Sequence, residues 1–267
     1  MNQQQQVNPA LHQKVLMFNS AERNSGTVES FTQNINIDTN TNKFSKITLL
    51  NACVPKGYYM IDSGVRTTIT FADNGGFTSF LFPETAADTG RNYSVTELAA
   101  LLKAALDNLA GAVYTVTYDS SRGKFVITRD DLLNFQLAIQ GTSDSDKDVA
   151  RYLGLEQDGS YTFYTSTTSS AQRVNLQRYD VIYLNCSLAN NNGNERLAEL
   201  FLSGTGNSDV LEFQPADSCM NARGLADNLT NQVNMSITDR NNKNIDMNGL
   251  EWRCAICLYD DRIQTRC

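Results

Sequence analysis

The residues of this chain best suited to metal binding or nucleophilic chemistry are six cysteines and a single histidine. The cysteines are Cys53, Cys186, Cys219, Cys254, Cys257 and Cys267. Only Cys254 and Cys257 are close in sequence, but a zinc site needs two more soft ligands, and His12 lies far away in a polar segment. Residues three apart in a strand also point to opposite faces, which prevents this pair from chelating one ion. We therefore expect buried, reduced cysteines, with disulfides only where the mature assembly meets an oxidising medium.

The residue sets of common catalytic sites are also missing from the sequence. A metal-dependent cupin needs several histidines, and a cysteine nucleophile needs a histidine base close to its thiol. No G-x-S-x-G, H-E-x-x-H or phosphate-binding glycine loop is found, and the G-x-G at 204–206 lies in a polar turn without the rest of a fingerprint. We assign no catalytic, metal-binding or cofactor-binding residues and do not expect an enzyme.

Acidic residues occur in pairs and in one Asn-rich segment. Asp130/Asp131 and Asp260/Asp261 sit at the predicted ends of strands, where solvated turn residues are the simplest interpretation. The segment 239–246 carries an aspartate at each end and could bind calcium through oxygen ligands, but its spacing is not that of an EF-hand loop. A plain turn is the favoured interpretation of this segment.

One aromatic and Thr-rich stretch could form a binding surface. Tyr161, Phe163 and Tyr164 lie within SYTFYTSTT. They could face a sugar or a neighbouring subunit, whereas the simpler interpretation, which we favour, is an edge strand.

Composition narrows the function classes further. Hydrophobic residues make up 41% of the 267 residues, charged residues only 19%, and the net charge is -7. Because basic residues are scattered singly, we expect no direct nucleic-acid binding. No apolar run approaches the roughly 20 residues of a membrane span, and the start MNQQQQVNPALHQK has no apolar core of a secretory signal. We therefore expect a soluble protein and treat the Asn-x-Ser/Thr sequons as chance matches; they begin at Asn92, Asn185, Asn228 and Asn234.

Two strands are predicted at the C-terminal end. Val233, Met235 and Ile237 alternate with polar residues, as in a strand with one buried face. A second strand has an apolar face made by Leu250, Trp252, Cys254, Ile256 and Leu258. We predict that the two strands pair as a closing hairpin across the polar segment 239–249, with the only tryptophan plugging the core.

The rest of the chain suggests a β-rich domain with a different region in its middle. Residues 1–12 have no periodicity and are expected to be a flexible arm. Strands are predicted at 14–18, 31–37, 44–55, 65–72, 77–82, 179–188 and 209–215, whereas 195–202 is left open. The strand at 44–55 is nearly continuously apolar from 47 to 54, which predicts a central strand covered on both faces.

The region from 84 to 173 has a mixed pattern. Ser94 and Glu97 form a capping box before leucines at helical spacing, and 146–155 reads as a short helix. Between them, 112–118 and 124–129 form a hairpin and 132–139 adds a strand. We predict an all-β single jelly roll of about eight strands in two antiparallel sheets, comprising 13–83 and 174–267, with an α+β insertion at 84–173.

The order of motifs resembles the penton or minor capsid proteins of double-stranded DNA viruses with jelly-roll capsids, a group of virophages, polinton-like viruses and large eukaryotic DNA viruses. The pieces that carry the likeness are FNSAERNSGTVESFTQNINI, FSKITLLNACVPKGYYMI, NYSVTELAALLKAAL, TYDSSRGKFVIT, ARYLGL and MSITDRNNKNIDMNGLEWRCAICL. The resemblance implies a single jelly roll that assembles into homo-pentamers at icosahedral vertices, with the insertion as an outer knob.

The expected function is therefore a structural role in the virion, with neighbouring major and minor capsid proteins as partners. The alternatives are a minor capsid or cement protein between the major capsomers, and a lectin-like jelly roll that binds a host receptor or glycan through the insertion. We expect contacts to be made by segments rather than by single residues: the arm at 1–12, the turn at 19–26 and the tip of the insertion.

Overall fold

The computed structural model of the protein describes residues 13–37, 44–62, 67–73, 76–110, 113–139, 149–155, 162–164, 167–170, 173–190, 195–202, 209–216, 221–226 and 230–260. The chain divides into two compact units, which we call unit 1 (Met1–Tyr58 with Tyr179–Cys267) and unit 2 (Tyr59–Arg178). Unit 2 therefore interrupts unit 1 in sequence, between strands β4 (Lys46–Pro55) and β12 (Val181–Cys186). The expected arm at 1–12 lies outside the described residues.

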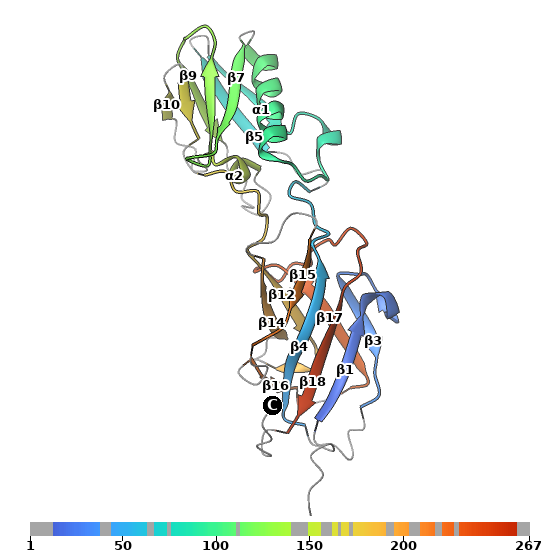
Figure 1. Cartoon of the computed structure of the whole chain (residues 1–267). Helices are drawn as coiled ribbons and strands as arrows, with labels where there is room; N and C mark the ends of the chain where they lie inside the picture. Colours follow the sequence, from blue (N-terminus) through green and yellow to red (C-terminus); the bar gives the residue numbers. More distant parts are fainter. Residues whose placement is uncertain are drawn as a thin grey trace, which may run out of the picture. The chain divides into compact units, whose positions relative to one another are not determined.

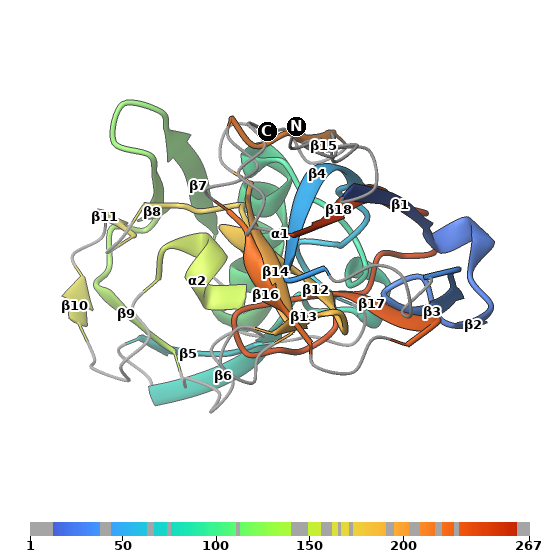
Figure 2. The same cartoon turned by 90° about the horizontal axis from the view of Figure 1, so that it is seen from below.

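Unit 1 contains a six-stranded antiparallel sheet, which we call sheet A. Its strand order is β1-β18-β4-β16-β13, and β15 also pairs with β4. Its strands other than β4 are β1 (Gln13–Asn19), β13 (Ala189–Asn190), β15 (Val210–Phe213), β16 (Arg223–Leu225) and β18 (Arg253–Tyr259). Figures 1 and 2 both show β18 between β1 and β4, so the last strand of the chain lies between two of the earliest.

The opposing sheet, sheet B, has five strands in the order β14-β12-β17-β3-β2. Its strands other than β12 are β2 (Ser25–Gly26), β3 (Ser30–Asn34), β14 (Arg196–Phe201) and β17 (Gln232–Thr238). The segment at 195–202, which the sequence left open, is thus a strand, and it lies at the end of this sheet. A short 3-10 helix, η2 (Ser20–Glu22), follows β1.

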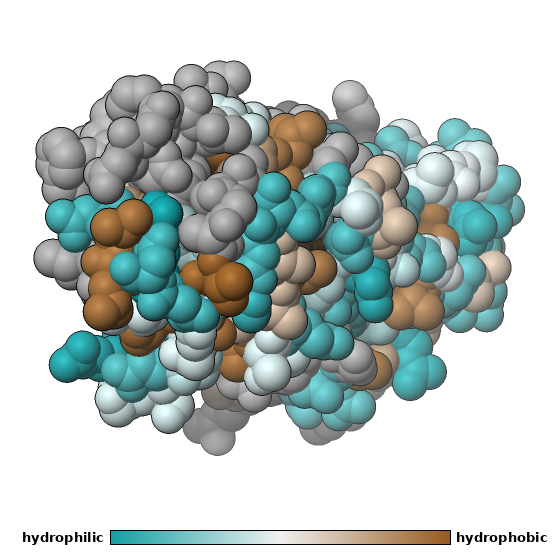
Figure 3. All heavy atoms as spheres, turned by 90° about the horizontal axis from the view of Figure 1, so that it is seen from above, coloured by the Kyte–Doolittle hydropathy of each residue, from teal (hydrophilic) through white to brown (hydrophobic). Residues whose placement is uncertain are grey.

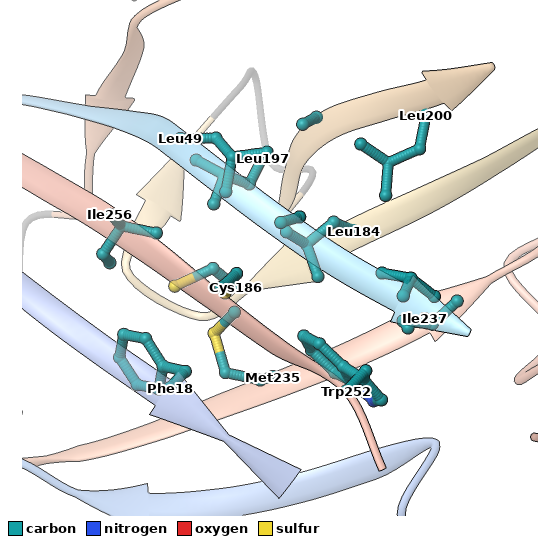
Figure 4. Close-up of a cluster of buried hydrophobic side chains, with 14 of the residues drawn as sticks. Phe18, Leu49, Leu184, Cys186, Leu197, Leu200, Met235, Ile237, Trp252 and Ile256 are labelled. Carbon is teal, nitrogen blue, oxygen red and sulfur yellow. The ribbon is translucent and has the colours of Figure 1, made fainter. Parts of the chain in front are cut away.

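The core of unit 1 lies between the two sheets. Figure 4 shows Phe18 and Trp252 from the sheet A side and Met235 and Ile237 from sheet B pointing toward one another. All four side chains are at most 1% exposed. The indole Nε1 of Trp252 donates a 2.7 Å hydrogen bond to the carbonyl oxygen of Val28, which removes the desolvation cost of its polar atom. Burial of this side chain contributes on the order of 2 to 3 kcal/mol, as expected of a core plug.

The prediction of a closing hairpin is wrong. β17 pairs with β3 and β12 in sheet B, whereas β18 pairs with β1 and β4 in sheet A. The two strands therefore face each other across the core, and the segment between them crosses from one sheet to the other. The predicted buried face still holds for Trp252, Cys254, Ile256 and Leu258. The strand itself starts only at Arg253, and Leu250 is 48% exposed.

Strand β4 is central, as predicted, but it is not covered on both faces. Its ladder with β18 pairs Ala255 with Asn51 and Ile256 with Leu49, so Leu50 is an extra residue at a bulge. The bulge shifts the alternation, and the inward side chains are therefore Leu49 on one side of it and Ala52 on the other. Asn51 is exposed. The apolar run in the sequence is thus long because the bulge changes which alternate residues point into the core, and not because both faces of the strand are covered.

The described part of unit 2 contains two small sheets, one long helix and two short helical segments. One sheet has the order β10-β9-β5-β6 and the other β11-β8-β7. The strands are β5 (Thr67–Asp73), β6 (Gly76–Phe82), β7 (Tyr114–Asp119), β8 (Lys124–Arg129), β9 (Phe135–Ile139), β10 (Thr162–Tyr164) and β11 (Thr167–Ser169). The helices are α1 (Val95–Ala110), the short α2 (Val149–Leu153) and the 3-10 helix η3 (Ala86–Asp88).

The predicted capping box starts α1. The Ser94 backbone N–H donates to Glu97 Oε2 over 2.8 Å, and the Glu97 N–H donates to Ser94 Oγ over 3.2 Å. Leu98, Leu102 and Leu106 on the inner face of the helix are fully buried in a second core, which also contains Phe125. The helix and the hairpin of β7 and β8 thus form where the sequence pattern predicts them.

The inserted unit begins earlier than the sequence analysis placed it. The segments at 65–72 and 77–82 were expected in the jelly-roll domain, but β5 pairs with β9, and Ile69 lies in the core of unit 2. The division falls at Tyr59 and Arg178 rather than at 84 and 173. The hairpin signal between β5 and β6 was local and carried no information about which sheet the hairpin joins.

Candidate assembly surfaces

The cysteines that the structure describes lie in strands of unit 1 and are free. Cys186 and Cys254 are fully buried between the sheets. Burial raises the pKa of Cys186 to about 12 and raises the pKa of Cys254 as well, so both remain thiols at neutral pH. Cys257 is 8% exposed and points to the other face of β18, as the spacing predicted. Among the described residues, no group of three His, Cys, Asp or Glu could hold a metal ion; His12, Cys219 and Cys267 lie outside them.

The acidic residues between β17 and β18 organise a turn. Asp239 Oδ1 accepts hydrogen bonds from the backbone N–H groups of Asn241 and Lys243 at 2.8 and 2.9 Å. Asp246 Oδ1 accepts one from the N–H of Asn248 at 2.8 Å. These carboxylates therefore complete local backbone hydrogen bonding, as the plain-turn interpretation requires.

The turn at 19–26 is partly used inside unit 1. Ser20 is fully buried, its N–H donates to the carbonyl oxygen of Trp252, and its hydroxyl oxygen accepts from the N–H of Trp252, both over 2.9 Å. The same hydroxyl donates to Glu251, and Arg23 lies 3.4 Å from that carboxylate. This turn therefore ties the end of β1 to the start of β18, and only its outer residues, such as Asn24, are exposed.

The outer face of sheet B is polar and uncharged along β3 and β17. Thr32 Oγ1 donates to Asn234 Oδ1 over 2.8 Å, and the Asn234 N–H donates to Ser187 Oγ over 3.0 Å. Asn185 Nδ2 donates to Thr238 Oγ1 over 2.8 Å. The side chains are thus held in fixed positions by one another, and this face offers neutral hydrogen-bonding groups to a neighbour.

The outer face of sheet A has a different chemistry. Val15 is 56% exposed and Met17 is 61% exposed, both on β1. Beside Met17 lies a hollow of about 510 Å³ with Cys53, Glu212 and Arg253 in its lining. An apolar strip with one charge of each sign suits contact with a protein surface better than contact with a small charged ligand.

The two edges of the sandwich also differ. At the edge where β1 ends sheet A and β2 ends sheet B, the Gln33 side chain of β3 contacts β1. Its Oε1 accepts from the Asn19 N–H over 3.1 Å, and its Nε2 donates to the Met17 carbonyl over 3.3 Å. At the opposite edge, a hollow of about 230 Å³ lies beside β14. Its lining comprises Leu49, Leu197, Ala198, Glu199, Phe201, Phe213, Pro215, Asn221 and Arg223. Among the described residues, the first edge is therefore closed by a side chain, and no strand lies beyond β14 at the second.

Unit 2 carries the predicted aromatic stretch and an unpredicted apolar loop. β10, which contains Phe163 and Tyr164, is an edge strand paired with β9, as favoured; Tyr161 lies outside the described residues. Elsewhere, Val113, Leu132 and Leu133 are 57%, 70% and 45% exposed. From the side shown in Figure 3, the exposed hydrophobic residues form small separate patches among hydrophilic ones.

The apolar residues of these surfaces were not singled out from the sequence. The exposed residues of β1 could have been predicted. The residues from 15 to 18 are all apolar, and a strand buries only alternate side chains against one core, so two of the four must lie on the outer face. Phe201 had no such signal, since its segment was not assigned to a strand.

The described helices include none that is long and apolar enough to cross a membrane.

No protein-family model matches the sequence, and no curated protein matches it. The structure belongs to the mainly β class, with two antiparallel sheets packed face to face and a second unit between β4 and β12. A solved structure of this class, the selenomethionine-labelled penton protein of mavirus, is similar with a TM-score of 0.57 and a probability of 1.00. The likeness covers 93% of this chain and 98% of that chain at 11% sequence identity, so it concerns the fold.

Proposed function

We propose that this protein is a structural capsid protein of a double-stranded DNA virus, and specifically the penton that forms pentamers at icosahedral five-fold vertices. The observation that carries the proposal is the likeness to the mavirus penton protein, because it spans nearly the whole of both chains and thus includes both units. A likeness limited to the sandwich would have supported only a common β fold.

The strand order supports a single jelly roll for unit 1. In its described part, eight strands have four residues or more. Four of these belong to sheet A, β1, β18, β4 and β15, and four belong to sheet B, β3, β17, β12 and β14. Except for β12 and β14, which are neighbours in sheet B, consecutive strands of this set lie in opposite sheets, as in an antiparallel sandwich wrapped into a jelly roll. We place the α+β unit as an insertion between the third and fourth of these strands.

The surfaces of unit 1 are compatible with a ring. A closed five-fold ring needs two different complementary patches on each copy, because its contacts are heterologous. The outer faces of sheets A and B point in opposite directions and differ in chemistry, with Val15 and Met17 on one and the Thr32 and Asn234 network on the other. Neighbouring capsid proteins would contact the remaining surfaces in the virion.

The test is the mass of the purified protein by light scattering, combined with negative-stain imaging. We expect particles with five times the 29.6 kDa mass of one chain and five-fold symmetric rings. Rings of another symmetry would overturn the penton assignment. A protein that stays monomeric both alone and with the major capsid protein would favour a cement or receptor-binding role.

Two variants sharpen this test. Met17→Lys places a charge in the exposed apolar strip of sheet A, and we expect the concentration at which rings dissociate to rise by about tenfold or more. Leu250→Lys changes a comparably exposed residue in a loop and serves as the matched control. Equal effects of the two variants would remove the outer face of sheet A from the interface.

A further inference from the structure

The edge of unit 1 beside β14 has, in the described residues, the properties of a groove for an extended peptide segment. In the part of the chain that the structure describes, β14 pairs only with β12, so the backbone groups on its other side are not used in a sheet. Such an edge can accept an added strand through main-chain hydrogen bonds. The adjoining hollow has Leu49 and Leu197, each 1% exposed, in its lining. The groove thus offers both a backbone template and an apolar floor.

The rim of the groove indicates which chemistry would fill it. Glu199 and Arg223 both line the hollow, so the groove has one charge of each sign and no net preference for a charged segment. The Nε atom of Arg223 is buried and has no hydrogen-bond partner among the described residues. A buried donor of this kind favours an occupant that brings a hydrogen-bond acceptor, and an amide carbonyl is one that leaves the balance of Glu199 and Arg223 unchanged.

A segment of this chain has the matching composition. Residues 1–12, MNQQQQVNPALH, carry four glutamines, no acidic, Lys or Arg side chain, and the apolar residues Val7, Ala10 and Leu11. The segment 261–267, DRIQTRC, carries three charged side chains and fits the neutral groove less well. Twelve extended residues reach up to about 40 Å, which exceeds the length of a short edge strand.

The topology indicates which copy supplies the segment. The segment leads into β1, at the sealed edge of the sandwich, whereas the groove lies at the opposite edge beside β14. In a head-to-tail ring each copy contacts the next through two different surfaces, and a segment of up to about 40 Å that leaves one copy beside β1 can reach the β14 edge of the following copy. We propose that residues 1–12 of each copy add as a strand to the β14 edge of its neighbour. This inference rests on the proposed function for the identity of the neighbour.

A photo-cross-linking experiment tests the inference on the full chain. Phe201, which is 61% exposed at the rim, is replaced by a photoreactive phenylalanine analogue in a mixture of ¹⁴N-labelled and ¹⁵N-labelled copies. We expect cross-linked peptides that join position 201 of one isotope to residues 1–12 of the other. Cross-links within one copy only, or to another segment, would overturn the inference. The analogue at Leu250 is the control and should not cross-link to residues 1–12.

A second measurement tests binding of residues 1–12 to the groove independently of ring formation. A fluorescent peptide of residues 1–12 is titrated into the full chain and into the Phe201→Ser and Leu250→Ser variants. We expect saturable binding that Phe201→Ser weakens about tenfold and Leu250→Ser leaves unchanged. If rings form but the cross-links and the peptide binding are absent, the groove assignment fails while the penton proposal stands. If no rings form and the peptide still binds at position 201, the penton proposal fails instead.

Discussion

At the scale of single residues, carboxylates in this protein stabilise backbone turns, and Glu29 is the best placed example. Its Oε1 accepts the N–H of Met247 over 3.0 Å, while its carbonyl oxygen accepts the N–H of Ile237 over 2.9 Å. Partial burial raises its pKa, but hydrogen bonds from its own N–H, from Met247 and from Thr27 lower it more, so the net pKa lies below the usual value of 4.5. Glu29 thus attaches the loop before β3 to the segment between the sheets.

The lowered pKa predicts a pH-dependent contribution of Glu29 to stability. A carboxyl whose folded pKa is depressed stabilises the protein above its unfolded pKa, and this stabilisation is lost as the pH falls through the folded value. Glu29→Gln keeps an acceptor but removes the charge, so we expect it to reduce the free energy of unfolding by about 1 kcal/mol or less at pH 7. The difference from the natural protein should shrink below about pH 4.5. Denaturant titrations at pH 7, 5 and 3 measure it.

Glu22→Gln provides the matched control for Glu29. Its side chain is exposed and has one long contact, 3.5 Å from Asn19 Nδ2. We expect this variant to change the free energy of unfolding less than Glu29→Gln does at pH 7, because it loses a single long contact at an exposed site. A loss that is the same at pH 7 and pH 3 for Glu29→Gln would show that the charge is not what stabilises the loop.

At the scale of elements, the capping box of α1 predicts a measurable effect on unit 2. Ser94→Ala removes the acceptor for the Glu97 N–H and the hydroxyl donor to the Glu97 carboxylate. The pKa of this carboxyl is lowered first by the Ser94 backbone N–H, which the variant keeps, and then by the Ser94 hydroxyl. We expect a cost of about 1 kcal/mol in the free energy of unfolding. Thr96→Ala changes an exposed residue of the same turn and should be neutral or slightly stabilising, since alanine favours helices. Equal destabilisation by both variants would argue against the cap.

At the scale of the whole molecule, two separate cores predict two units that fold by themselves. The ends of unit 2 are tied together, because Arg178 donates to the Tyr59 carbonyl over 2.9 Å and to Asp62 Oδ2 over 2.8 Å. Ile61 also forms an antiparallel bridge with Arg91. We expect residues 59–178 expressed alone to show a cooperative thermal transition by circular dichroism. Arg178→Ala should lower the midpoint of that transition, whereas an isolated unit without cooperative unfolding would contradict the prediction.

Much of the fold could be predicted from local pattern. Alternation placed the strands around Met235 and Ile256, and the capping box with its leucines placed α1. The C-x-x-C spacing predicted opposite faces for Cys254 and Cys257, as found. The pairing of β17 with β18 was wrong because alternation shows which face of a strand is buried and says nothing of its partner. The phase change at Leu50 was missed because a bulge leaves no mark in composition.

The sequence by itself determined most of the segments that form strands, most of the side chains that leave water and where the helix starts, because these depend on residues a few positions apart. Only the tertiary structure decided that the strands around Met235 and Ile256 belong to opposite sheets and that the hairpin of β5 and β6 belongs to unit 2. It also decided that Gln33 contacts β1 and that, in the described part of the chain, no strand lies beyond β14. These features depend on pairings between residues far apart in the chain. Local periodicity is satisfied equally well by several such pairings, and the packing of the complete core selects one of them.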